Sequence, residues 1–314
     1  LKIDTEKWKL SSYWNKQHKE YWLVSAMISQ KKLEPQDFLS ETIKNFNPKY
    51  IPVAKVHIND KFSDPTVGVL SIQDLHFGKE DNADVKTAFE KAIQELMLRS
   101  YYSHKLEKIV YVIGGDLLNM DTFGGLTTKG TPVDSDQRAQ DAYDTAFESM
   151  FWSVNFIKQF CDTLEVVYLP GNHDRLSSYH LVHALSKCFI KEPNVEFNAT
   201  YSERKVITYG DNFFAFEHGD VTKKLTPLVY ATEFPKQWGA TIFRTCYTGH
   251  FHTKKVTEFV TDNEVHGFAI KHLPSLCKSD YWHYHNKFTG SKRQAIMEIH
   301  DKVKGKISEF TYTA

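Results

Sequence analysis

The residues of this sequence that are best suited to chemistry follow the apolar run 166–169. A Pro-Gly break ends that run, and Asn172, His173 and Asp174 come directly after it. These three side chains can supply a metal ligand, a proton donor and an orienting carboxylate. Polar residues after a glycine are also usual in ordinary turns, so this stretch alone leaves both interpretations open.

Polar side chains follow four other apolar runs in the same way. These runs cover residues 67–72, 109–113, 213–217 and 242–248, and each reads as a buried strand. In an open α/β sheet, ligands sit in the crevice outside the carboxyl ends of the strands. We therefore expect seven donor side chains to converge on one place: Asp74, His76, Asp116, Asn172, His218, His250 and His252.

The chemistry of this donor set indicates metal binding. The donors are carboxylate, amide and imidazole groups without a thiolate, which suits Mn, Fe or Zn better than a cysteine-rich structural zinc site does. The seven donors exceed the needs of one ion and fit two ions that share a carboxylate. Two ions about 3.5–4 Å apart are the usual clamp for displacing a phosphoryl group by water.

Alternating strands and helices must position these donors. Helical spacing of apolar residues is found over 82–102, 136–160 and 177–190, between the predicted strands. After residue 252 the pattern predicts strands alone. This order is typical of an α/β domain, which we expect over residues 67–314.

Residues 1–66 read as a separate appendage. Aromatic residues bracket the polar turn 15–19, which predicts a hairpin, and residues 35–46 have the pattern of a short amphipathic helix. We expect this appendage to pack on the main domain. A role in binding nucleic acid or a partner protein is the alternative.

The composition is that of a globular protein. Of 314 residues, 41% are hydrophobic and 14% aromatic. Lys plus Arg and Asp plus Glu each total 39, and this balance argues against a protein that binds nucleic acid with its whole surface. No signal peptide shows at the start of this sequence, which contains no apolar run of about 18 residues and no C-x-x-C pair among its four cysteines. We expect a cytoplasmic protein with reduced thiols and no membrane partner.

The five motifs together resemble the calcineurin-like metallophosphoesterase superfamily. The series is Asp-x-His at 74–76, Gly-Asp at 115–116, Gly-Asn-His-Asp at 171–174, His218, and Gly-His-x-His at 249–252. The resemblance covers residues 67–314 and implies a four-layer α/β/β/α sandwich with two central sheets. It implies that Asp116 bridges two metal ions and that His173 donates a proton to the leaving oxygen or clamps the phosphate. The ligands implied for the two ions are Asp74, His76 and His252 for the first, and Asn172, His218 and His250 for the second.

The second motif departs from that of the protein phosphatases in this superfamily. Those enzymes carry Gly-Asp-x-x-Asp-Arg-Gly, whereas here Asp116 is followed by Leu-Leu-Asn-Met at 117–120. The arginine that grips a phosphomonoester is absent, and Asn119 stands where a carboxylate would orient the histidine. This form is closer to the DNA-repair nuclease and phosphodiesterase branches. Residues 127–132 with Asp136 and Arg138, together with residues 282–293, resemble phage and prophage members.

Two further stretches are candidates for contact with the substrate. Residues 127–138 predict either a lid, with Arg138 reaching a phosphate, or a solvated loop with a helix cap. Residues 278–293 combine aromatic and basic side chains that can stack bases and hold phosphates, and an amphipathic hairpin is the alternative. The candidate substrate-binding residues are Arg138, Tyr281, Trp282, Lys292 and Arg293.

Taken together, these features predict a two-metal phosphoesterase. The expected reaction is attack of a metal-bridging hydroxide on a phosphodiester of DNA, RNA or a nucleotide, with Mn favoured over Fe, Zn or Mg. His173 and Asp174 are the predicted catalytic residues. One alternative is a phosphomonoesterase acting on nucleotides or proteins. Another is a metal-binding scaffold without turnover, against which the complete ligand set and His173 argue.

Overall fold

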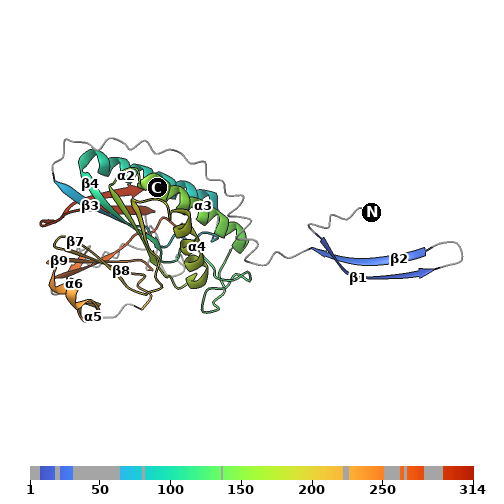
Figure 1. Ribbon diagram of the computed structural model, residues 1–314. Coiled ribbons are helices and arrows are strands. Elements are labelled where there is room, and N and C mark those ends of the chain that lie inside the picture. Colours follow the sequence, from blue (N-terminus) through green and yellow to red (C-terminus); the bar gives the residue numbers. More distant parts are fainter. Residues whose placement is uncertain are drawn as a thin grey trace. The chain divides into compact units, whose positions relative to one another are not determined.

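The chain divides into two compact units, Leu1–Val53 and Ala54–Ala314, which Figure 1 shows. The computed structural model describes residues 8–17, 22–30, 64–79, 82–135, 137–221, 226–250, 262–264, 267–278 and 293–314. Within these ranges, no helix combines the length and the apolar character needed to cross a membrane.

The first unit contains two strands, and the first of them runs through residues 15–17 of the predicted turn. Strands β1 (Trp8–Gln17) and β2 (Trp22–Gln30) pair antiparallel, with Gln17 opposite Trp22. The helix predicted over 35–46 lies outside the described residues. The division of the chain at residue 66, and the role of the appendage, stay predictions.

A six-stranded sheet forms the first half of the second unit. Four of its strands are parallel, and the three internal ones of these are buried apolar runs, as expected for strands covered on both faces. An antiparallel pair completes one edge of the sheet. In spatial order the strands are β13 (Gly305–Thr313), β12 (Gln294–Asp301), β3 (Pro65–Ser71), β4 (Lys105–Gly114), β5 (Thr163–Leu169) and β6 (Val195–Asn198).

A five-stranded sheet forms the second half. Strands β8, β9 and β11 run parallel, and the two outer strands are antiparallel to their neighbours. In spatial order the strands are β10 (Asp262–Glu264), β11 (Phe268–His272), β9 (Phe243–Thr248), β8 (Asn212–Glu217) and β7 (Lys205–Tyr209).

The two sheets pack face to face, and helices cover their outer faces. One buried apolar cluster draws on both sheets, with Val69, Val110 and Val167 from one and Phe214 and Phe216 from the other. The confirmed architecture is therefore the predicted α/β/β/α sandwich (Figure 1). The helices are α2 (Asn82–Ser103), α3 (Ala139–Ile157) and α4 (Arg175–Cys188) on the six-stranded sheet, and α5 (Thr226–Glu233) and α6 (Pro235–Gly239) on the other.

Hydrogen bonds from buried tyrosines fix two of these helices on the first sheet. The hydroxyl of Tyr111 in β4 lies 2.9 Å from Ser153 Oγ in α3, and that of Tyr168 in β5 lies 3.2 Å from Ser178 Oγ in α4. On the outer face of the second sheet, Phe213 and Phe268 pack with Tyr230 of α5. The helix that carries the residues after β5 is thus held at a defined height above the sheet.

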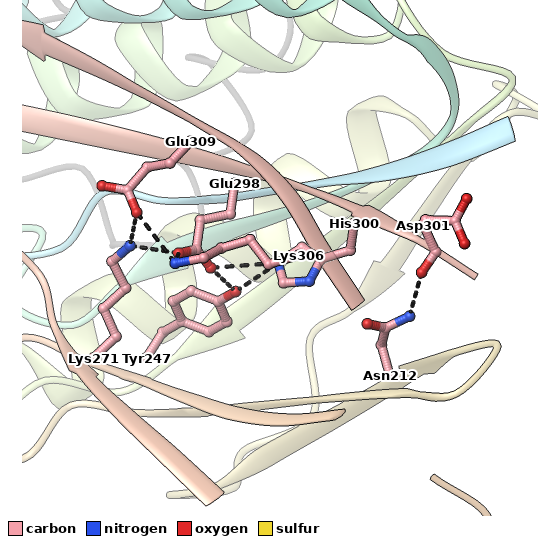
Figure 2. A network of polar contacts seen from close by, with 8 residues as sticks. All are labelled: Asn212, Tyr247, Lys271, Glu298, His300, Asp301, Lys306 and Glu309. Atoms are coloured by element: carbon pink, nitrogen blue, oxygen red, sulfur yellow. Dashed lines mark hydrogen bonds and ion pairs between the residues drawn. The ribbon is translucent and has the colours of Figure 1, made fainter. Parts of the chain in front are cut away.

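A buried charged network joins the two sheets, and Figure 2 shows it. Lys271 of β11 bonds Glu298 of β12 at 2.5 Å and Glu309 of β13 at 2.7 Å. The hydroxyl of Tyr247 in β9 donates to Glu298 Oε2 at 2.5 Å. Burial acts to raise the pKa of Glu298, but the bond from His300 and the charge of Lys271 hold that pKa well below its usual value. The carboxylate therefore stays ionised between the sheets.

Lys271→Met should destabilise the protein far more than loss of an exposed lysine. The change leaves the buried Glu298 charge without its nearest cation, and breaking a buried pair in this way costs about 3–5 kcal/mol. The matched control is Lys86→Met, which removes a surface pair with Glu148 between α2 and α3 and should cost about 1 kcal/mol or less. Urea unfolding measures both; equal losses in the two variants would show that the network contributes no more than a surface pair.

Candidate metal centre

The predicted donors stand at the carboxyl ends of parallel strands from both sheets. Asp74 and His76 follow β3, Asp116 follows β4 and Asn172 follows β5, and these three strands are neighbours in one sheet. The donors His218 and His250 follow β8 and β9, which are neighbours in the other sheet. His252 lies outside the described residues.

Backbone conformations of an unusual kind are concentrated at this edge. Among the described residues, the non-glycine residues with positive φ are Asp74 (57°), His76 (49°), Asp116 (60°) and His250 (67°). All four are predicted ligands. The left-handed backbone conformation is unfavourable for L-residues other than glycine. Residues strained in this way are concentrated at functional sites, where the surrounding structure enforces the conformation. Here the Asp74 amide donates to the Gly115 carbonyl at 2.7 Å.

Two glycines of the motifs allow these donors to approach each other. A Cβ atom on Gly171 would lie 2.1 Å from both the amide nitrogen and Oδ1 of Asp116. A Cβ atom on Gly249 would lie 2.5 Å from Asp74 Oδ2. Any larger residue at either position would displace a candidate ligand, which explains why glycine precedes the polar residues in both motifs.

The structure gathers the donors into two groups that share Asp116. One group is His76, Asp116 and His173, and the other is Asp116, His218 and His250; in each, the ligand atoms all lie within 4.8 Å of one another. Each group could hold a metal ion.

Asn172 and Asp74 lie beside these two groups. His218 Nε2 is 3.0 Å from Asp116 Oδ2 and 3.0 Å from Asn172 Oδ1, so these three atoms already converge. The Asp74 carboxylate accepts the His250 amide at 2.9 and 3.1 Å. All the described members of the predicted ligand set are therefore brought together at one edge of the sandwich.

Buried carboxylate and imidazole groups interact strongly at this edge. Burial raises the pKa of Asp74 to about 7. Burial alone would lower the pKa of His218, but the neighbouring Asp116 carboxylate raises it to about 9, and His218 in turn helps to keep the pKa of Asp116 below its usual value. A divalent cation bound here would replace the proton of His218 and stabilise the buried carboxylates. Carboxylate, imidazole and amide donors without thiolate fit Mn, Fe or Zn.

A hydrogen bond to a backbone carbonyl orients the His173 ring toward Asp116. Its Nδ1 donates to the Asn119 carbonyl oxygen at 2.9 Å, which leaves Nε2 facing Asp116 Oδ2 at 4.0 Å. Asn119, which stands where a carboxylate would orient the histidine, uses its side chain elsewhere: its side-chain amide donates to the Asp134 carbonyl at 3.0 Å. The asparagine therefore does not impair the orientation of His173.

Asp174 is buried and forms hydrogen bonds with the segments next to the candidate ligands. Its side chain is fully buried, and its Oδ2 accepts the Leu118 amide at 2.7 Å. Its carbonyl accepts both the amide and the hydroxyl of Ser178 in α4, at 2.8 and 2.7 Å. These contacts tie the segment after β4 to the start of α4, which makes Asp174 a positioning residue; a direct part in catalysis stays a prediction.

Asp121 is a positioning residue that the sequence did not single out. Its carboxylate accepts the amides of Leu176 and Ser177, at 3.2 and 2.8 Å, and the Ser177 hydroxyl at 2.8 Å. It thereby satisfies the start of α4, where Asp174 stands at the N-cap position without a capping bond from its side chain. The carboxylate comes from a loop about fifty residues earlier in the chain, so no local sequence pattern reveals it.

Thr128 joins the same loop to the residues around His173. The Thr128 amide donates to the His173 carbonyl at 3.1 Å. Its hydroxyl donates to Asp121 at 2.7 Å and accepts the Arg175 amide at 3.0 Å. The loop after β4 thus fixes the backbone on both sides of Asp174. A lid over residues 127–138 stays a prediction, and a lid that moved Thr128 would have to break these bonds.

The candidate substrate-binding residues that the structure describes are engaged elsewhere. Arg138, at the start of α3, forms a two-pronged bond to the exposed Asp141 at 2.8 and 2.7 Å. Arg293 donates to the Leu276 carbonyl at 2.6 Å and pairs with Asp84 at 2.8 Å. Tyr281, Trp282 and Lys292 lie outside the described residues, so their role stays a prediction.

Comparison with known proteins gives a likeness to solved structures. No family model matches the chain, and no curated protein sequence matches it. Among solved structures, the chain is similar to the crystal structure of Chaetomium thermophilum Vps29, with 12% sequence identity and a TM-score of 0.32. The match covers 78% of this chain and 98% of the Vps29 chain.

Proposed function

We propose that this chain is a two-metal phosphoesterase whose preferred substrates are phosphodiesters of nucleic acid or nucleotides. The observation that carries this proposal is the position of Asp116, which belongs to both His/Asp groups at the carboxyl ends of the strands. One shared carboxylate between two groups is the arrangement that holds two ions side by side. The motif resemblance supports the same assignment.

The ligand assignment follows the motifs. Asp116 would lie between the two ions. The other ligands would be Asp74, His76 and His252 for the first ion, and Asn172, His218 and His250 for the second. When bound, two such cations neutralise phosphate oxygens and acidify water near neutral pH. We favour Mn, with Fe, Zn or Mg as alternatives.

His173 is the residue of this chain placed to handle a proton of the leaving group. Its Nδ1 is fixed on the Asn119 carbonyl, so only Nε2 is available to a substrate. Its side chain is 25% exposed, whereas the side chains of His218 and Asp116 are 2% and 1% exposed. A protonated His173 can therefore donate from Nε2 to an oxygen that leaves from the open side of the centre.

We expect a preference for diesters because no arginine follows Asp116 in this motif and because Arg175 already pairs with two carboxylates. The residues after Asp116 are the buried Leu117 and Leu118, so no arginine stands there to grip a phosphate dianion. Arg175, which follows His173-Asp174, is paired with Glu203 and Asp220. A diester carries one negative charge fewer than a monoester and depends less on such a grip.

Assays of the purified chain with added Mn test the proposal. The panel contains single- and double-stranded DNA, RNA, cyclic nucleotides, a nitrophenyl phosphodiester and phosphoserine peptides, each with an EDTA-treated control. We expect hydrolysis of diesters that EDTA abolishes and Mn restores. Brisk dephosphorylation of peptides with every oligonucleotide and cyclic nucleotide left intact would instead identify a phosphomonoesterase, and inactivity on the whole panel would contradict the proposal.

A further inference from the structure

Aromatic rings line the exposed side of α4 beside the metal centre. Tyr179 contacts Tyr201 edge to face, with ring centroids 5.9 Å apart. On its other side it stacks with His183 at 5.8 Å and an interplanar angle of 24°. Tyr201 and His183 are exposed, and Tyr179 is half-buried. We call Arg175, Tyr179, His183 and Tyr201 the α4 ring surface.

Arg175 connects the α4 ring surface to the centre. It is the first residue of α4 and comes two residues after His173. Its Nη2 lies 3.7 Å from the carboxylate of Asp220, which stands two residues after His218. Its Nη1 lies 3.5 Å from the Tyr201 hydroxyl. The hydroxyl end of Tyr201 therefore lies toward Arg175, while 54% of the residue remains exposed.

The exposure of this ring needs an explanation. Exposed apolar groups that cluster beside a functional site commonly mark a binding surface. Leu176 and Val221, which directly follow Arg175 and Asp220, are also exposed, at 59% and 65%. Exposed apolar side chains therefore flank the charged residues on this side of the centre.

We propose that the α4 ring surface binds a nucleobase of the substrate strand, next to the phosphate held at the centre. This inference rests on the proposed function. Flat rings presented edge-on and face-on suit stacking with bases, which is how proteins hold unpaired strands without reading their sequence. The occupant is therefore a single-stranded segment, because a paired base in a duplex does not offer its face.

The charges around Tyr201 also shape this binding. Glu203 and Asp220 offset the charge of Arg175, the cation that contacts the Tyr201 hydroxyl, so attraction of phosphates by Arg175 contributes little. Stacking then supplies most of the affinity, and the dependence of binding on salt is shallow, with a log–log slope near −1 or smaller in magnitude. A surface that bound the backbone through several cations would show a steeper slope.

Binding of a fluorescein-labelled oligothymidine, followed by fluorescence anisotropy with EDTA present, tests the inference without turnover. Stacking of one base on one ring is worth about 1–3 kcal/mol, so Tyr201→Ala should weaken binding about tenfold. Tyr201→Phe keeps the ring and should bind almost as the unchanged chain does. Tyr102→Ala is the matched control, because Tyr102 is 68% exposed at the far end of α2 and should have no effect.

An abasic strand of equal length and charge completes the test. It should bind weakly, and Tyr201→Ala should not weaken it further, because the ring has lost its partner. Equal affinity of the unchanged chain and Tyr201→Ala for oligothymidine, or an equal loss with the abasic strand, would overturn the inference. The proposed function is tested separately, by turnover of the nitrophenyl diester by the unchanged chain with Mn. Binding of oligothymidine without such turnover would contradict the phosphoesterase proposal and would still support the base-binding surface.

Discussion

Asp116→Ala should lower phosphodiester turnover by at least about 1,000-fold and remove most of the bound metal. Asp116 is the only residue common to the two His/Asp groups of the described chain, so its loss leaves both ions short of a ligand. It also accepts the His173 amide at 2.7 Å and faces His218 at 3.0 Å. Loss of a single group that stabilises transition-state charge commonly reduces turnover about 100- to 1,000-fold, and here two ions depend on one carboxylate.

Asp116→Asn separates the charge of this residue from its shape. The amide preserves the volume and one oxygen acceptor, so the chain should unfold at a similar urea concentration while turnover and metal content still fall. Asp141→Asn, in the exposed pair with Arg138, is the control and should keep both. Elemental analysis gives the number of ions per chain. Two ions and normal turnover in Asp116→Asn would mean that Asp116 does not bridge the metals.

The sequence predicts the frame of the centre well because local patterns encode it. Buried parallel strands read as continuous apolar runs. The run at 109–113 falls within β4, and the run at 67–72 overlaps β3 up to the last residue of that strand. The helical pattern over 82–102 coincides with α2. Once parallel strands are identified, their carboxyl ends must share an edge of their sheet, so the meeting of Asp74 and Asp116 follows from topology without any side-chain geometry. His218 follows a strand of the other sheet, and it meets Asp116 because the two sheets pack face to face.

The contacts that orient the side chains could not be predicted in this way. The group that holds His173 is a backbone carbonyl, and every residue type provides one, so the sequence carries no signal for it. The bonds from Asp121 to α4 and from Lys271 to Glu298 join segments far apart in the chain. Asp121, Lys271 and Glu298 are of residue types that are usually solvated. Their pairing depends on how the loops and sheets pack, which periodicity does not encode.

His173→Ala should slow the hydrolysis of natural diesters about 100- to 10,000-fold, and that of a nitrophenyl diester only slightly. An alkoxide leaving group needs a proton as the bond breaks, and help from a general acid is worth this factor. A nitrophenolate is stable enough to leave without one. The geometry supports this role because the Asn119 carbonyl holds Nδ1 and leaves Nε2 on the open side of Asp116. Aryl diesters with leaving groups of graded pKa measure the effect as the slope of log kcat/KM against that pKa, which should become steeper in His173→Ala.

The competing role for His173 is that of a ligand, since its imidazole lies with His76 and Asp116 in one His/Asp group. Loss of a metal ligand and loss of a proton donor have different effects on metal content and on the dependence of the rate on leaving-group pKa. Loss of a ligand lowers the metal content, slows all leaving groups by the same factor, and leaves the slope unchanged. Loss of a proton donor leaves both ions in place and penalises poor leaving groups in proportion to their basicity. The side chain of His173 is 25% exposed, whereas that of His218 is 2% exposed. A residue that must meet the leaving oxygen needs such access and an internal ligand does not, so we expect the steeper slope with two ions retained.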